Sequence, residues 1–444
     1  MRTASKKILL LLGLALFASS SYSQIKSLYV ATSDTGFIPE VFDTTIAAKQ
    51  NIRFDYVSLK STGNDTFKII LPSAITVRQV RVIKSKQTVT GEPPRFSWFG
   101  KIEGQPTSLV LFSNVGNAVS GYIRDSNNKV YRIQYRGNNV HQITEINTQL
   151  VQPDRVMQPQ PVMAGAETEK KCCDTIAHQV DVMVVYTVKA RDSAGGTSSI
   201  LSAIEICIQQ ANLSYQNSNL NQSLNLVHTA EVSYVEDENA ELNLERLINP
   251  TDGPLDEVHH WRDTYDADIV VLMVDFMAGF TGISRVMTTN SVAFASQALC
   301  VVRYNDSFSS LVFTHEVGHI MGAGHELCDA NWSGLFTYSH AFTGSNYRTV
   351  MAMSAANRIE YWSNPAINYP GATGTPMGVS GGACPSNNSL TLAQTINTVT
   401  KFRCKTVCEN NCRWLSSWWF WITLILAILL LVFLYWFFFR RNRS

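Results

Sequence analysis

The chain has 444 residues, of which 45% are hydrophobic and 16% are charged. This length accommodates two or three domains of about 100–200 residues each, and the low charged fraction excludes a long disordered or coiled-coil protein. The net charge of +1 provides no basic field for nucleic acid. Residues 24–165 carry a net charge of +6 and residues 166–413 a net charge of −11. Such an asymmetry is consistent with two regions that dock on each other, although it also arises by chance.

The N-terminal residues 1–23 are typical of a secretory signal peptide. Basic residues precede an apolar run over 8–17, and Ser21 and Ser23 stand before an expected cut at Gln24. We therefore expect the chain to be exported.

Residues 24–150 are predicted to form a β-rich domain. The stretches 107–113, 118–124 and 129–135 are rich in β-branched and aromatic residues and are separated by turn signals. The region 151–171 contains three prolines among polar and small residues and is predicted to be a linker.

The pattern becomes α/β in residues 172–405, for which we expect a mixed twisted sheet with helices. The run 267–275 is almost continuously apolar, as in a central strand buried on both faces. Further strands are expected over 180–187, 224–234 and 291–303 (the last as a strand pair), and helices over 198–215, 242–247, 255–264, 308–321 and 390–402.

The C-terminal region contains an uncharged stretch, 418–439, which would be about 33 Å long as a helix and could cross a membrane. The arginines in 440–444 are expected to stay in the cytoplasm, and 406–417 would form a stalk. These features predict a single-pass protein whose bulk lies outside the cytoplasm, in the periplasm or at the cell surface. The same pattern resembles bacterial sorting tails that are removed after export, so a released form remains an alternative.

All nine cysteines lie beyond residue 170. Export permits disulfides, and the odd number leaves at least one thiol without an intramolecular partner. Cys404, Cys408 and Cys412 are spaced for one helix face; we expect stalk disulfides there, with a metal or redox role as the alternative.

The segment from His315 to His325 carries the chemistry: His-Glu-Val-Gly-His-Ile-Met-Gly-Ala-Gly-His. On a helix, His315 and His319 lie one turn apart on one face, and Glu316 projects beside them as a candidate general base. Gly322 permits a left-handed turn that ends the helix, after which His325 can supply a third nitrogen. Three protein ligands with one open position are typical of a catalytic zinc site.

This segment resembles the HExxHxxGxxH motif of the metzincin zinc metalloendopeptidases, which is followed by a methionine-containing turn. The run 347–352 and the run 358–365 (Arg-Ile-Glu-Tyr-Trp-Ser-Asn-Pro) are similar to the reprolysin-like group, especially to the bacterial peptidyl-Asp metalloendopeptidases. The resemblance is specific over 308–366, plausible over 177–405 and loose over 24–165. It implies that Met351 lies beneath the ligands and that 24–150 is a propeptide, removed by processing in 151–171.

Two departures from the family pattern concern the surroundings of the metal. Glu326 follows the third histidine where relatives usually have Asp, and Met353 occupies a position where several metzincins carry a Tyr. The family position of Arg358 indicates a specificity pocket for an acidic residue; a structural role, bound to Glu360 or to backbone carbonyls, is the alternative.

The expected function is zinc-dependent hydrolysis of polypeptides, with Glu316 taking a proton from the attacking water and an edge strand near 279–286 holding the substrate. The propeptide would act as an intramolecular inhibitor, and Cys172 or Cys173 could ligate the zinc in a latent precursor. The alternatives are a zinc-dependent deacylase and a membrane-anchored adhesion or binding protein.

Other polar clusters are expected to be less important. His259 and His260 fit a solvated helix face, and His340 fits a satisfied surface histidine that could approach the cleft. The acidic run 236–238 could bind Ca²⁺, but more often such a run is a solvated loop.

Overall fold

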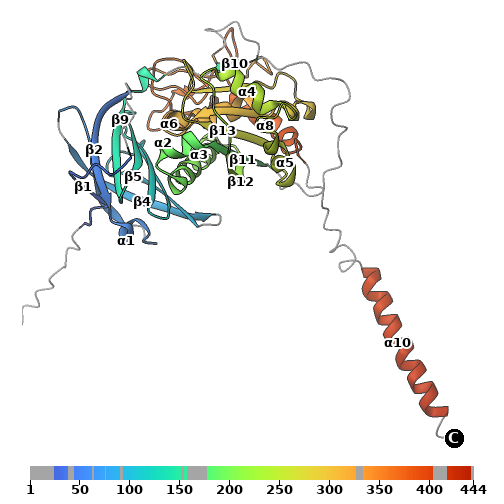
Figure 1. Cartoon of the computed structure of the whole chain (residues 1–444). Coiled ribbons are helices and arrows are strands. Elements are labelled where there is room, and N and C mark those ends of the chain that lie inside the picture. The colour runs from blue at the N-terminus through green and yellow to red at the C-terminus, as the bar shows by residue number, and fades with distance from the viewer. Residues whose placement is uncertain are drawn as a thin grey trace, which may run out of the picture.

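The computed structural model describes residues 25–38, 45–62, 65–75, 77–90, 94–151, 155–157, 178–326, 334–403 and 418–441. Within these ranges the chain forms an N-terminal domain (residues 25–151) built on a nine-stranded sheet and a central domain (residues 178–403) built on a six-stranded sheet with helices (Figure 1). The predicted signal peptide, most of the linker and the stalk lie outside the described residues, as do Cys172, Cys173, Cys404, Cys408 and Cys412.

The N-terminal domain confirms the predicted β-rich character. Its strands pair antiparallel in the order β1-β2-β9-β8-β7-β6-β5-β4-β3. The bounds are β1 (Tyr29–Ala31), β2 (Ile46–Phe54), β3 (Thr66–Leu71), β4 (Arg78–Thr90), β5 (Arg95–Ile102), β6 (Leu109–Val115), β7 (Ala118–Arg124), β8 (Val130–Gly137) and β9 (Val140–Ile146), with the short helices α1 (Tyr56–Leu59) and η1 (Thr148–Leu150).

The nine-stranded sheet curls until its two edges meet. The backbone N–H of Leu28 donates to the carbonyl of Lys68 at 2.9 Å, and the N–H of Lys68 donates to the carbonyl of Lys26 at 2.9 Å. Closure removes most of the unpaired edge and encloses an apolar core that includes Trp98 and Phe112. This domain therefore has a core of its own, and no disulfide contributes to it, since no cysteine precedes residue 172.

The central domain contains a mixed sheet in the order β10-β14-β15-β13-β11-β12. Its strands are β10 (Arg155–Met157), β11 (Gln179–Thr187), β12 (Ser223–Val232), β13 (Ile269–Val274), β14 (Gly282–Arg285) and β15 (Leu299–Arg303). Every residue of β13 is buried, which confirms the prediction of a central strand. Only β14 pairs antiparallel with its neighbour, β15.

Helices cover both faces of this sheet and account for the alternation seen in the sequence. They are α2 (Val188–Ala194), α3 (Thr197–Asn217), α4 (Ala240–Ile248), α5 (Asp256–Thr264), α6 (Tyr304–Ser307), α7 (Val312–Ile320) and α8 (Asn388–Val399), and a small sheet of β16 (Asn364–Asn368) and β17 (Pro376–Met377) follows α7. Helices α3 and α7 contribute to one apolar cluster, and α4 and α5 to the cluster on the opposite face.

Two predicted elements need correction. Residues 291–303 are not a strand pair: Val292–Gln297 forms the 3-10 helix η2, because Ser291 accepts a hydrogen bond from the N–H of Ala293 and caps it, and only Leu299–Arg303 is a strand. The strand expected near 279–286 does form as β14, but it is not the outermost strand. Linker residues Arg155–Met157 pair with it as β10, in parallel with Ile283–Arg285.

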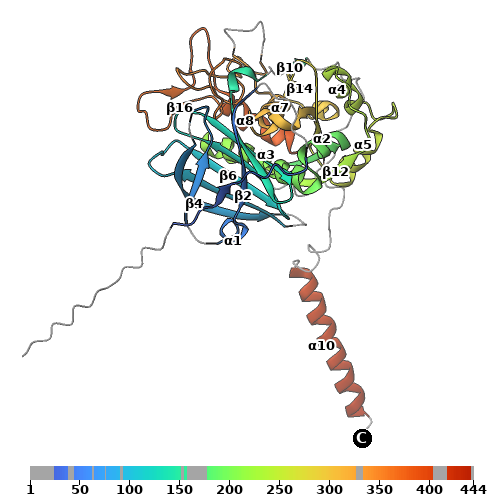
Figure 2. The same cartoon turned by 60° about the vertical axis from the view of Figure 1, so that its left-hand side comes forward.

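The C-terminal stretch forms helix α10 (Trp418–Arg441), which stands apart from both sheets in two views (Figures 1 and 2). Its side chains are described over 421–434 and at Trp436, and the large apolar ones are exposed, Leu431 by 65%. Among the described residues, no helix has the length and apolarity needed to cross a membrane. The structure therefore does not confirm the predicted membrane-spanning helix.

Candidate active site

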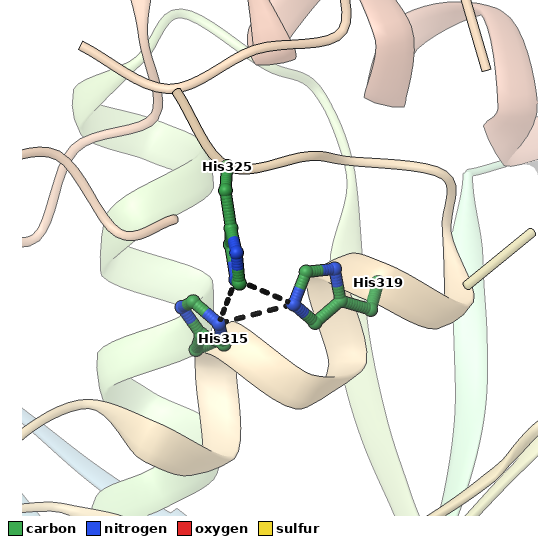
Figure 3. A group of neighbouring side chains, drawn as sticks. All are labelled: His315, His319 and His325. Carbon is green, nitrogen blue, oxygen red and sulfur yellow. Dashed lines mark hydrogen bonds between the residues drawn. The ribbon is translucent and has the colours of Figure 1, made fainter. Parts of the chain in front are cut away.

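Helix α7 positions the first two histidines of the motif. It lies against β14 and β15, and every one of its residues is buried. His315 and His319 project from the same side of the helix, one turn apart, toward His325 (Figure 3). The helix is shorter than predicted because Leu311, with a φ of 56°, turns the chain into it only at Val312.

The chain reverses after α7 as the glycine spacing predicts. Gly322 has a φ of +89°, and a Cβ there would lie 2.6 Å from Leu335 Cδ2. Asn388, at the start of α8, then fixes the approach to His325: its side-chain N–H donates to the carbonyl of Gly324 at 2.9 Å, and its oxygen accepts from the N–H of Gly324 at 3.1 Å. Two helices thus determine where His325 lies.

The three Nε2 atoms form a small triangle. His315 and His319 are 3.1 Å apart, His315 and His325 3.1 Å, and His319 and His325 3.0 Å. Tetrahedral zinc with Zn–N distances of about 2.0–2.1 Å separates its nitrogens by about 3.3 Å. The geometry therefore fits a single zinc ion.

The protonation pattern of the rings also fits a cation. Nδ1 of His315 faces the carbonyl of Val350 at 2.9 Å, and Nδ1 of His319 faces the carbonyl of Ala323 at 3.0 Å. A carbonyl can only accept, so each Nδ1 carries the proton and each Nε2 presents a lone pair to the centre of the triangle. Burial, followed by the charge of Arg358, holds the pKa of His315 well below its ordinary value, which favours the neutral imidazole that a metal requires.

Glu316 follows the first ligand, His315, on α7, and its side chain lies against β14. Its side chain is buried, and Ser284 Oγ donates a short hydrogen bond to Oε2. A Cβ at position 282 would lie 2.4 Å from Oε1, so Gly282 leaves the space that the carboxylate occupies. The carboxylate is therefore held by two residues of one strand.

Met351 lies beneath the histidines, where the family resemblance places it. A Cβ at Gly318, between the two helical histidines, would meet Met351 Sδ and the Trp362 ring, each at 2.7 Å. Val350 accepts from His315 and donates its own N–H to the carbonyl of Tyr361 at 2.9 Å. The turn is thus tied both to a histidine and to the segment that follows it.

Glu326 has a defined role in the structure. Its two carboxylate oxygens accept from the backbone N–H of Met353 at 3.0 and 3.1 Å, and one of them also accepts from Thr343 Oγ1 at 2.9 Å. The residue after the third histidine therefore holds the end of the methionine turn.

Arg358 is 4% exposed and binds backbone carbonyls: Nη1 donates to Ser310 at 2.8 Å and Nη2 to Ala352 at 3.4 Å. It does not bind Glu360, which pairs with Arg124 of the N-terminal domain. Arg358 therefore makes the contacts to backbone carbonyls that the structural alternative expects.

The remaining predictions have mixed outcomes. His340 is not a surface residue: it is 2% exposed, and its Nδ1 is 3.0 Å from the carbonyl of His325, which it supports. His259 binds the carbonyl of Leu247 at 3.0 Å, away from the metal centre.

In the acidic run 236–238, the carboxylate of Glu236 accepts hydrogen bonds from Thr187 Oγ1 and from the N–H of Phe276. Among the described residues, the three histidines are the only group of three or more His, Cys, Asp or Glu side chains placed to hold a metal.

Two functional residues were missed by the sequence analysis: Asn388 and Ser284. Each lies far along the chain from the group it contacts, 64 residues in one case and 32 in the other. Neither belongs to a recognisable short motif, so a single sequence carries no signal for them.

Comparison with known proteins agrees with this geometry. The family model described as "Metallo-peptidase family M12" matches residues 177–363. The peptidyl-Asp metalloendopeptidase of Stenotrophomonas maltophilia (strain R551-3) is 28% identical over 68% of this chain and 72% of its own length. That of Xanthomonas campestris pv. campestris is 29% identical over 67% and 70%.

Among solved structures the likeness is weaker. Metalloproteinase-II from Bacteroides fragilis aligns with a TM-score of 0.36 and 11% identity, over 61% of this chain and 84% of that one. The sequence matches, together with a histidine triangle that fits zinc, lead to one conclusion: residues 177–363 match the metallopeptidase family M12, and the chain is a zinc metalloendopeptidase.

Proposed function

We propose that the chain is made as a latent precursor and that Glu316 is the general base of the mature enzyme. The observation that carries the role of Glu316 is a buried carboxylate, held by Ser284, on the residue next to His315, whose Nε2 converges with those of His319 and His325. A bound zinc ion would supply the Lewis-acid polarisation of the scissile carbonyl and of the attacking water. His315, His319 and His325 would hold it.

The residues of the chain provide the proton transfers and the positioning. Glu316 takes the proton from the attacking water and passes it to the departing amine nitrogen as the peptide bond breaks. Ser284, by donating to Oε2, fixes the orientation of the carboxylate. The backbone edge of β14 binds the substrate in an extended conformation.

The inhibitory segment of the precursor is β10. It pairs with the same edge of β14 that an extended substrate would use, and the N–H of Val286 donates to the carbonyl of Met157 at 3.1 Å. A peptide cannot add to this edge while β10 occupies it, so removal of β10 by cleavage within 151–171 activates the enzyme. Ligation of the zinc by Cys172 or Cys173 in the precursor stays a prediction, because both lie outside the described residues.

The substrate preference proposed here is for an acidic residue on the carboxyl side of the scissile bond. Two relatives are named for Asp, and the charge of Arg358 is close enough to His315 to lower its pKa. A buried guanidinium charge near the reaction centre favours a carboxylate in the adjacent subsite. A peptide library in which aliphatic residues dominate that position would disprove the preference.

We also propose that the enzyme is exported and held at a membrane by residues 418–439. The support is the sequence of the two termini and the row of exposed apolar side chains on α10, since an exposed apolar surface of this kind indicates an apolar partner. Protease treatment of intact cells would release the central domain if it faces outward, and would leave it intact if it faces the cytoplasm.

Zinc analysis and peptide cleavage by residues 24–413, cut in the linker, test the catalytic proposal. We expect one zinc ion per chain and hydrolysis of a plain, unmodified polypeptide. A deacylase would not cleave such a polypeptide. Glu316→Gln should keep the zinc and lose activity by about 10²–10⁴-fold, the usual contribution of a positioned acid–base group. Cleavage by this variant at the wild-type rate would refute the role of Glu316.

A further inference from the structure

The two domains share one apolar core. Strands β6 and β7 are buried at every residue, because one face lines the closed sheet and the other packs against α3 of the central domain (Figure 2). A single cluster contains residues of both domains, which from the N-terminal side are Leu109, Leu111, Val115, Tyr122, Val130 and Ile146. Continuous apolar packing of this kind is typical of permanent rather than transient interfaces.

A buried ion pair crosses this interface. Arg124, at the end of β7, donates to Glu360 Oε2 from Nη2 at 2.6 Å and from Nε at 3.1 Å. The Arg124 side chain is 6% exposed and that of Glu360 is 0% exposed. The remaining guanidinium nitrogen donates to the carbonyl of Thr107 and to Asn128 Oδ1, each at 3.0 Å. The N-terminal domain therefore presents a fixed, preorganised cation to the central domain.

Glu360 belongs to the segment that supports the metal centre. It lies between Arg358, which donates to the carbonyl of Ala352 next to Met351, and Trp362, whose ring lies against the position of Gly318. The carbonyl of the next residue, Tyr361, accepts a hydrogen bond from the N–H of Val350. The carbonyl of Val350 in turn accepts a hydrogen bond from Nδ1 of His315. Arg124 is thus linked to the zinc ligand His315 through three residues of the central domain, Glu360, Tyr361 and Val350.

Two other residues of the N-terminal domain contact the same region. Asn128 Nδ2 donates to the carbonyl of Asn346 at 3.1 Å, and Thr148 hydrogen-bonds the side chain of Asn357. Both partners lie close to the methionine turn, on either side of it. These two contacts, like that of Arg124, therefore reach the segments that support the active site.

We infer that the N-terminal domain stays bound after the linker is cut and that Arg124 is a positioning residue for the reaction, acting through Glu360. Cutting the linker removes one covalent connection and none of these contacts. Separation would expose the apolar face of α3 and leave Glu360 without its cation, which is strongly unfavourable at a buried site. The part of this inference that concerns activity rests on the proposed function, whereas retention of the domain does not.

Retention is tested without activity. In residues 24–413 with Glu316→Gln, one recognition sequence of an unrelated protease is inserted after residue 152 and a second replaces 165–170, so that β10 is cut out of the linker. The cut protein is passed over a gel-filtration column at micromolar concentration. The two fragments are expected to elute together. Elution as separate fragments in native buffer would overturn the inference, whatever the peptidase assay shows.

The ion pair is tested with matched variants of the same protein. Arg124→Met should raise the dissociation constant of the fragments by roughly a hundredfold or more, since it leaves a buried carboxylate unpaired, and Arg124→Lys should raise it less. Arg53→Met is the control, because Arg53 pairs with Asp34 within the N-terminal domain at an exposed site. If Arg124→Met does not fold, Glu360→Gln replaces it. Equal dissociation constants for the wild type and for the folded variant would overturn the role of the pair.

Positioning is tested with the cut, active enzyme. Arg124→Met should raise KM and change the preference for the residue after the scissile bond at unchanged zinc content, and Arg124→Lys should restore most of both. A purely structural role would lower only the amount of active protein, and that result would overturn the positioning role. Absence of cleavage by every form, wild type included, would disprove the proposed function and leave the elution test to decide on retention.

Discussion

The carboxylate of Glu326 accepts two hydrogen bonds from one backbone N–H, that of Met353, at 3.0 and 3.1 Å. These two residues are 27 positions apart, and their contact joins the end of the zinc motif to the end of the methionine turn. Thr343 donates to the same carboxylate. Glu326, which follows the metal ligand His325, therefore fixes the end of the methionine turn.

Glu326→Ala should therefore lower the free energy of unfolding by about 1–3 kcal/mol, the usual cost of leaving a partly buried donor without its acceptor. Glu326→Gln retains one acceptor oxygen and should have a smaller effect. Urea unfolding of the zinc-loaded protein measures both. Equal losses for the two variants would show that the carboxylate does not act through the Met353 N–H.

Gly282→Ala should abolish peptide cleavage while zinc remains bound. The added Cβ would lie 2.4 Å from Glu316 Oε1 and 2.7 Å from Val312 Cγ1, so the carboxylate must move from its place beside the metal. Gly381→Ala is the matched control, because a Cβ there meets nothing within 4 Å. Zinc content and kcat/KM, measured on both variants, decide; wild-type activity in Gly282→Ala would mean that Glu316 acts from another position.

Asn388→Ala should weaken zinc binding by about 10–100-fold, as loss of an outer hydrogen bond to a metal-binding segment usually does. The variant removes both contacts that hold the backbone of Gly324, next to His325. Competition with a chromophoric chelator measures the affinity. Asn387→Ala, which removes the cap of α8 from the N–H of Leu390, should lower stability by about 1 kcal/mol but leave zinc affinity unchanged.

The N-terminal domain should lose stability in acid because of His141. This residue is fully buried, its Nε2 accepts from the N–H of Val119 at 3.0 Å, and burial lowers its pKa to about 3. Below an unfolded-state pKa of about 6.5 the unfolded chain gains a proton that the folded chain does not, so stability falls as the pH falls from about 6.5 toward 3.

At pH 4.5 this contribution is about 3 kcal/mol relative to neutral pH. His141→Gln keeps an acceptor for Val119 and should lose less stability than the wild type between pH 7.5 and pH 4.5, in urea unfolding of the Glu316→Gln chain. Zinc release affects both proteins alike. His260→Gln, at an exposed histidine, should behave as the wild type; an identical pH dependence in His141→Gln would exclude His141 as the cause.

How far the sequence predicts the structure depends on the range of the interaction. The spacing of His315, His319 and Gly322 is set within one helix and its end, and these local geometries follow from the residue order. The buried strand 267–275 was likewise predicted from its composition. Ser291–Arg303 was mispredicted because one serine side chain caps a 3-10 helix in a stretch that is otherwise apolar.

Contacts between distant segments could not be predicted. The pair of Arg124 and Glu360 spans 236 residues, and neither partner is distinguished locally from any other charged residue. The hydrogen bond between Ser284 and Glu316 and the clamp of Asn388 on Gly324 depend on how α7, α8 and β14 pack. The pairing of β10 with β14 has the same origin, since three linker residues become a strand only where a sheet edge is free to receive them.

This last pairing leads to a prediction about latency. Replacing Arg155–Met157 by Gly-Pro-Gly removes the side chains and one N–H donor of β10, and so the strand should leave the edge of β14. The uncut precursor should then cleave peptides about 10–100-fold faster than the wild-type precursor, as expected if two or three hydrogen bonds of about 1 kcal/mol each are lost.

The control is the same replacement at 161–163, elsewhere in the linker, which should leave the precursor latent. Initial rates with a short peptide, before any linker cleavage is detected on a gel, provide the measurement. If the variant stays as inactive as the wild-type precursor, β10 is not the inhibitory segment, and if the wild-type precursor is already as active as the cut enzyme, the linker confers no latency at all.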